Sequence, residues 1–217
     1  MSRFVHLLRY VVPTVGLVSN LWALHCVVVS LPLPGFGGHF QFLTILGLLV
    51  ATLAFFLKVV RLFVPGAFDS MHEMVVNIAT PVEGLITVLY WPMVLYNRDL
   101  LASPDVAFIL PLRLDLSLHF WPAVFLWVDF LAFNVEFKRT WRHIVVIYSF
   151  AILYYFWTSY CYSRNQFWVY PFLAEFSDTG RMLFFIACAT LCTLMYEAGA
   201  YIHAKIHHAT VGVIKKD

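Results

Sequence analysis

The chain has little charge, and it has no polar stretch long enough to form a separate soluble domain. Charged residues make up 12% of its 217 positions, hydrophobic residues make up 62%, and the mean hydropathy is +0.81. A soluble globular domain carries roughly twice this share of charge. The scarcity of charge excludes an ordinary soluble enzyme, and a net charge of only +2 gives no reason to predict a nucleic-acid partner.

Long apolar runs take the place of the missing charge. Each is about 20 residues long, the length that a helix needs to cross roughly 30 Å of hydrocarbon. We therefore predict an all-α polytopic membrane protein, a single domain over residues 1–217 in which six transmembrane helices form a bundle. The predicted spans cover residues 10–31, 42–64, 74–96, 114–134, 143–162 and 181–202.

The few basic residues are distributed unevenly between the two sides of this bundle. Six spans place ten of the fourteen lysines and arginines on the side of the two termini. Because cytosolic loops are enriched in Lys and Arg, we predict that both termini are cytosolic. The segments near 32–41, 97–113 and 163–180 would then lie on the lumenal or external side.

The chain also lacks the motifs of common hydrolases and nucleotide-binding proteins: no G-x-S-x-G, no Walker loop and no H-E-x-x-H. In the segment HAKIHH, His203 and His207 share one helix face, but a metal site would require further histidine boxes, so we predict no metal and no cofactor. The four cysteines lie in or beside spans and are expected to be core thiols, with a Cys26–Cys161 disulfide as an alternative.

Two residues in the predicted bundle could form a nucleophile and its base. Thr44 ends the segment GGHFQFLT and lies about two residues into the second span; His119 lies about five residues into the fourth. Their depths differ by roughly 5 Å, so both would lie just below one membrane surface. A threonine hydroxyl attacks an ester only when a base takes its proton, and imidazole suits that task. Alternatively, Thr44 is a helix N-cap and His119 hydrogen-bonds a neighbouring helix.

Acidic residues inside the spans indicate function as well, because a charge at mid-bilayer is costly. Glu83 lies in the middle of the third span, Asp129 approaches the cytosolic end of the fourth, and Glu197 lies deep in the sixth. We expect Glu83 to face the Thr44–His119 pocket. A rival function is a small proton-coupled transporter with Glu83 and Glu197 as its relay, and a third is a non-catalytic lipid-binding protein.

We expect further residues to complete the pocket. The glycine turn before Thr44 and the aromatic residues of the non-cytosolic segments would seat the site among acyl chains. The expected pocket residues are Gly38, Phe42, Trp168 and Tyr170, together with Glu83.

Several segments of the chain resemble the androgen-induced membrane hydrolase family. They are GGHFQFLT, TPVEGLITVLYWPMVLYNRDLL, LSLHFWPAVFLWVD and FWVYPFLAEFSDTGRMLFF. The resemblance implies a six-span protein that hydrolyses fatty acid esters of hydroxy fatty acids, with Thr44 as nucleophile and His119 as its partner. It also implies a membrane-lipid substrate and an endoplasmic-reticulum location. Glu83, where the family has a small residue, and Pro122, three residues after the histidine instead of five, depart from the family pattern.

Overall fold

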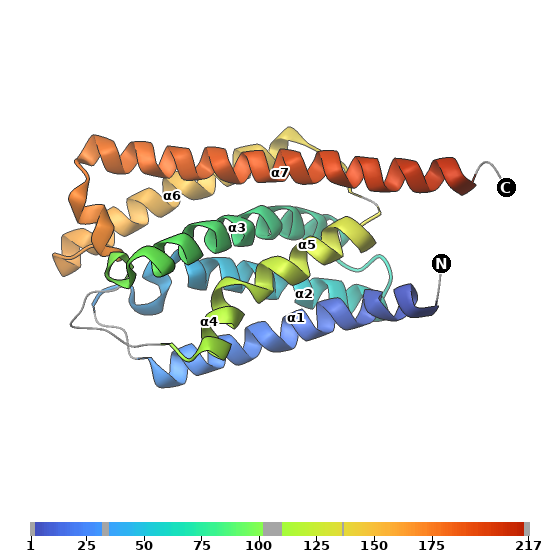
Figure 1. The fold of residues 1–217 in the computed structure, drawn as a ribbon, viewed down its shortest axis with the longest axis horizontal. Coiled ribbons are helices and arrows are strands. Elements are labelled where there is room, and N and C mark those ends of the chain that lie inside the picture. The colour runs from blue at the N-terminus through green and yellow to red at the C-terminus, as the bar shows by residue number, and fades with distance from the viewer. Residues whose placement is uncertain (1–2, 32–34, 102–109, 136, 215–217) are drawn as a thin grey trace.

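The computed structural model describes residues 3–31, 35–101, 110–135 and 137–214. Throughout these residues the regular structure is helical, which confirms the predicted all-α class (Figure 1). The α-helices are α1 (Arg3–Ser30), α2 (Leu43–Phe63), α3 (Asp69–Tyr96), α4 (Leu112–His119), α5 (Trp121–Phe133), α6 (Trp141–Asn165) and α7 (Asp178–Ile214). Short 3-10 helices are η1 (Gly38–Gln41), η2 (Arg98–Leu100) and η4 (Pro171–Glu175).

Within the described residues, five helices are long and apolar enough to cross a membrane, and α4 with α5 is a candidate for a sixth, bent span. Large apolar side chains such as Val18, Phe156 and Leu194 lie on the outside of the bundle. In a soluble protein such a surface would be unfavourable, whereas in a bilayer it faces lipid. The protein is therefore an integral membrane protein.

The fourth span is not the single helix that we predicted over 114–134. It is bent by 40° between α4 and α5, at Phe120. Pro122 has no N–H to donate to the carbonyl of Leu118, so the helical ladder is interrupted there. The carbonyl of His119 instead accepts hydrogen bonds from Thr87 Oγ1 at 2.7 Å and Trp91 Nε1 at 3.2 Å, both on α3.

The connecting segments gather at the two ends of the bundle as the alternating spans require. α1 ends, α2 begins, α3 ends and α7 begins at one end, while α1 begins and α7 ends at the other (Figure 1). Asn165, at the end of α6, links α6 to the segment that precedes α2. Its Nδ2 donates to Phe36 O at 3.1 Å and to Gln41 Oε1 at 3.0 Å.

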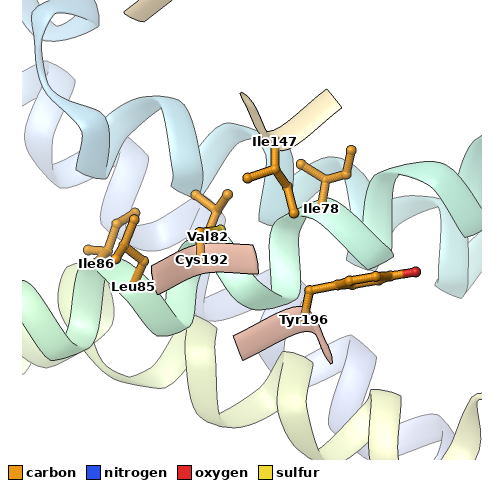
Figure 2. Packing of buried hydrophobic residues seen from close by; sticks show 7 residues of the cluster. All are labelled: Ile78, Val82, Leu85, Ile86, Ile147, Cys192 and Tyr196. Carbon is orange, nitrogen blue, oxygen red and sulfur yellow. The ribbon is translucent and has the colours of Figure 1, made fainter. Parts of the chain in front are cut away.

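The core between α3, α6 and α7 is built from closely packed aliphatic side chains (Figure 2). Packing matters here because lipid tails are as apolar as leucine, so the hydrophobic effect does not drive helices together inside a bilayer. The buried members are Ile78, Val82, Leu85 and Ile86 of α3, Ile147 of α6, and Cys192 and Tyr196 of α7. All four cysteines are free thiols, so the alternative Cys26–Cys161 disulfide is wrong.

The acidic residues of the spans have different environments. Asp129 is buried, and its Oδ2 pairs with the buried Lys58 Nζ at 3.1 Å. Glu197 lies on the outside of the bundle and not in its interior. There, two nitrogens of Arg139 donate hydrogen bonds to its carboxylate. Glu83 is completely buried.

Candidate functional site

A cavity of about 100 Å³ lies where the start of α2 meets α3, α6, α7 and the segment around Tyr170. Most of its wall is aliphatic or aromatic, which suits a hydrocarbon chain better than a polar ligand. The side chains in the wall that carry oxygen or a thiol are Thr44, Tyr90, Tyr154, Tyr170, Cys188 and Cys192.

Thr44 lies in the wall of this cavity as the second residue of α2. The residue at the N-cap position is Phe42, so Thr44 is not the helix cap that the sequence allowed as an alternative. Within the described part of the chain, no hydrogen bond involves the Thr44 hydroxyl. The hydroxyl is therefore available to a ligand in the cavity.

Among the described residues, the Thr44 amide in the first turn of α2 has no hydrogen-bond acceptor either. A continued helix would offer it the carbonyl of Phe40, but that carbonyl accepts from Trp157 Nε1 at 2.8 Å. The carbonyl of Gln41 accepts from Tyr154 Oη at 2.7 Å in the same way. Unpaired amides in the first helical turn are suited to binding a negatively charged oxygen.

Tyr170 fixes the start of α2 from the opposite side of the cavity. Its hydroxyl accepts from the Leu43 amide at 3.0 Å, and its ring packs edge-on against Phe42 at 5.9 Å. Burial raises the pKa of Tyr170 above its ordinary value, because the phenolate would lose its hydration. Tyr170 therefore remains a neutral phenol that orients the Thr44 turn.

His119 is the last residue of α4 and is held by two residues that our sequence analysis did not single out. Its Nδ1 bonds to Asp115 Oδ1 at 2.9 Å, and its ring stacks on Tyr90 with the centroids 3.4 Å apart. Tyr90 Oη also donates to Asp115 Oδ1, at 2.6 Å. A carboxylate on Nδ1 assigns the proton to that nitrogen, which leaves Nε2 as the basic atom.

No hydrogen bond joins Thr44 to His119 among the described residues, and His119 is not part of the cavity wall. Tyr90 lines the cavity together with Thr44, while its ring covers a face of His119. The spacing of Asp115 and His119, i and i+4 on one helix, was the signal in the sequence for their pairing.

Glu83 lies next to this site but does not line the cavity, whereas its neighbours Val82, Leu85 and Ile86 do. Its carboxyl faces α2 at Gly47, one turn after Thr44: a methyl group built on Gly47 would lie 3.0 Å from Glu83 Oε1. Neither carboxyl oxygen has a hydrogen-bond partner among the described residues.

The other expected pocket residues lie outside the cavity wall. Gly38 has a φ of +47° with nothing close to it, and Phe42 packs against Tyr170. Trp168 lies between the ring of Tyr162 and the guanidinium of Arg181, which is 4.5 Å from its ring centre. These residues support the segments around the site instead of forming its wall.

Two of the three histidines of HAKIHH, His203 and His207, are bound to the backbone at the far end of the bundle. His203 Nε2 bonds to Asn134 O at 2.7 Å, and His207 Nε2 bonds to Leu131 O at 3.1 Å. In the described part of the chain, no three His, Cys, Asp or Glu side chains gather as a metal site would require.

The comparison with known families is decisive for the class of protein. The model of the FAR-17a/AIG1-like protein family matches residues 6–204. This chain belongs to that family. The resemblance that we drew from the quoted segments is thereby confirmed.

Several curated proteins are similar to this family member along most of its length. A UPF0641 membrane protein of Schizosaccharomyces pombe is 31% identical over 208 residues, covering 93% of this chain and 92% of its own. The human androgen-induced gene 1 protein is 21% identical, covering 77% of each chain. The androgen-dependent TFPI-regulating protein of Mesocricetus auratus is 23% identical, covering 83% of this chain and 82% of its own. No solved structure matches the chain significantly.

The turn before Thr44 gives a first prediction. Gly37 has a φ of +89°, and a methyl group on it would lie 2.7 Å from Gln41 Cγ and 2.9 Å from Cys161 Sγ. Gly37→Ala should therefore lower the melting temperature in detergent and expose the buried Cys161 thiol, because crowding adds about 1–3 kcal/mol to the cost of a left-handed alanine. Gly38→Ala, with open space around it, is the control. Equal effects of the two variants would mean that crowding at Gly37 is unimportant.

Proposed function

We propose that this protein is an intramembrane hydrolase of lipid esters, with Thr44 as its nucleophile and His119 as its base. The observation that carries the proposal is the exposure of the unpaired Thr44 hydroxyl to an apolar cavity whose wall includes Tyr90, the residue stacked on His119. The family resemblance, which implies the same two residues, supports it independently.

In the proposed reaction, Thr44 Oγ1 attacks the ester carbonyl carbon while His119 Nε2 takes the hydroxyl proton. Asp115 holds the imidazole in the required tautomer and stabilises the imidazolium that forms. The unpaired Thr44 amide is placed to donate to the developing oxyanion. Because no hydrogen bond joins Thr44 to His119 within the described part of the chain, the proton passes through a bridging water or after closure around the substrate.

The imidazolium then protonates the departing alcohol oxygen as its bond to the acyl carbon breaks. Water attacks the acyl-threonine, giving its proton to His119, and Thr44 Oγ1 leaves and recovers a proton as the fatty acid is released. The cycle consumes one water and needs no metal or cofactor.

Labelling with a fluorophosphonate probe tests the nucleophile. The wild-type protein and Thr44→Ser should be labelled in detergent or bilayers, and Thr44→Ala should not. Thr52→Ala is the matched control, because Thr52 lies on the same helix but donates its hydroxyl to Leu48 O at 2.6 Å. Labelling of Thr44→Ala at the wild-type rate would rule out Thr44 as the nucleophile.

The resemblance also supports a substrate and a location. We propose fatty acid esters of hydroxy fatty acids as the substrate, taken laterally from the endoplasmic-reticulum membrane. Purified protein should hydrolyse a palmitate ester of hydroxystearic acid faster than a triacylglycerol of equal chain length. The reverse preference would assign a different ester to the site.

We further propose that both termini are cytosolic, because ten of the fourteen Lys and Arg residues lie on their side. A glycosylation acceptor inserted between residues 97 and 113 should then be modified, whereas the same acceptor at either terminus should not. The opposite pattern would place Thr44 near the cytosolic face.

A proton-coupled transporter is the second candidate, and the broken α4–α5 span favours it because transporters use interrupted helices. However, Glu83 and Glu197 cannot form the expected proton relay, because Glu197 lies on the outside of the bundle and pairs with Arg139. A non-catalytic lipid-binding protein would keep the cavity but would not need the Asp115–His119 pair. The labelling experiment separates both from the hydrolase.

A further inference from the structure

One face of α2 carries buried residues at a regular spacing. Gly47, Ala51, Ala54 and Lys58 follow one another at intervals of four, three and four, so they lie on one side of the helix. The first three are the small residues along this face, and the last one binds Asp129. This face, which we call the α2 inner face, runs from one turn beyond Thr44 towards the far end of the bundle.

Polar side chains that lack partners are buried against the same part of the bundle. Asn20 of α1, Asn77 of α3 and Glu83 of α3 are each at most 1% exposed. All of their side-chain oxygen and nitrogen atoms lack hydrogen bonds among the described residues, and so does Asp129 Oδ1.

The contacts of these groups place them at successive depths along the α2 inner face. Glu83 lies at Gly47. Gly16 of α1 packs against the ring of Phe55, so Asn20, four residues further along an antiparallel helix, lies level with Ala51. Along α3, Glu83 lies opposite Gly47 of α2, and His72 bonds to Arg61 of α2. Asn77 lies between these two contacts on α3, so it falls near the level of Ala54.

Neighbouring side chains show that Asn20 and Asn77 lie in the same part of the bundle interior. Leu17, one turn before Asn20, and Val76, next to Asn77, pack with Ala51 and Ala54 in a single cluster. At 1.5 Å per residue, the steps along the face are about 5–6 Å. That is the span of two hydrogen bonds in series through one water molecule.

Buried amide and carboxyl groups without protein partners are unfavourable, and lipid offers them no hydrogen bond. Water satisfies both kinds of group, because it donates and accepts, and buried waters typically make about three such bonds. A metal ion fits less well, because the described residues form no cluster of three metal-binding side chains.

We propose that Asn20, Asn77 and Glu83 bind a row of internal water molecules along the α2 inner face, from the Lys58–Asp129 pair to Glu83. Glu83 holds the last of them one helical turn from Thr44. If the proposed hydrolase function is correct, this row supplies the water that cleaves the acyl-threonine. Its oxygen bonds to the acyl carbon, its proton goes to His119, and the bond from the acyl carbon to Thr44 Oγ1 breaks.

Water-to-protein magnetisation transfer in solid-state NMR tests the binding without any assay of activity. In bilayers, the ¹⁵N-labelled side-chain amides of Asn20 and Asn77 should receive water magnetisation as fast as exposed Asn97, although both are buried. Uniform ¹³C and ¹⁵N labelling links each asparagine Nδ2 through its Cγ, Cβ and Cα to its own backbone amide, so Asn20 and Asn77 are both assigned and no substitution is required. Transfer to either side chain as slow as that to the Ala51 backbone amide would overturn the proposal.

A burst experiment with a chromogenic ester tests the supply of water to the site. Asn77→Leu should leave the acylation burst unchanged and lower steady-state turnover by about ten-fold. Thr80→Val is the control, because Thr80 is buried on the same helix but already donates to Val76 O. Unchanged turnover in Asn77→Leu would overturn the supply role. Absence of ester hydrolysis by the wild-type protein would instead contradict the hydrolase proposal, while the NMR result would stand.

Discussion

Replacing His119 by alanine should reduce ester hydrolysis by about 10²–10⁴-fold, the contribution of a well-placed general base. Thr44→Ala should be at least as damaging, and the double variant should be little worse than either single one. A nucleophile and its base act as a unit, so their losses do not add. Initial rates with one ester substrate, measured for the four proteins side by side, would establish the cycle.

Two residues that hold His119 refine this prediction. Asp115→Asn should cause a loss nearly as large, because an amide on Nδ1 no longer specifies the tautomer with a basic Nε2. Tyr90→Phe keeps the stacked ring and loses only the bond to Asp115, so its effect should be smaller. His207→Ala, at the far end of the bundle, is the control. Additive losses in the Thr44→Ala, His119→Ala double variant would show that the two residues act separately.

The largest effect on stability should come from Asp129→Ala. This change leaves the Lys58 ammonium buried without its partner, and breaking one side of a buried ion pair typically costs 3–5 kcal/mol. We expect a large drop in the melting temperature in detergent, together with poor expression.

The double variant Lys58→Met, Asp129→Leu should recover most of that stability, because two apolar side chains of similar size need no partner. Glu197→Ala breaks the exposed pair with Arg139 and should change stability little. A mild effect of Asp129→Ala would mean that Lys58 reaches water or another acceptor when its partner is removed.

The lengths of the apolar runs were sufficient to predict the helices, because a bilayer requires each span to satisfy its own backbone. They did not predict the break at Phe120. Pro13, Pro81 and Pro92 lie within continuous helices, so proline alone does not decide where a span breaks. The break between α4 and α5 combines Pro122 with two donors on another helix. Thr87 and Trp91 of α3 donate hydrogen bonds to the carbonyl of His119.

The candidate site was predictable to a similar extent. Depth and chemistry selected Thr44 and His119, and the helical spacing of Asp115 was present in the sequence. The stacking of Tyr90 on His119 and the pairing of Lys58 with Asp129 join different helices, and hydrophobic periodicity carries no information about such contacts. The sequence could not decide whether Trp168 lines the cavity, because an aromatic residue at an interface can face a pocket or pack against a neighbouring segment equally well.

The attachment of α4 determines which parts of the protein can change without moving His119. The backbone of His119 is bound by α3 and its side chain is braced by Tyr90 of the same helix, whereas the bend separates it from α5. Tilting of α5 in a thicker or thinner bilayer should therefore leave the imidazole in register with α3. Adaptation to membranes of different thickness can then proceed through the lipid-facing residues of α5 without realignment of the site.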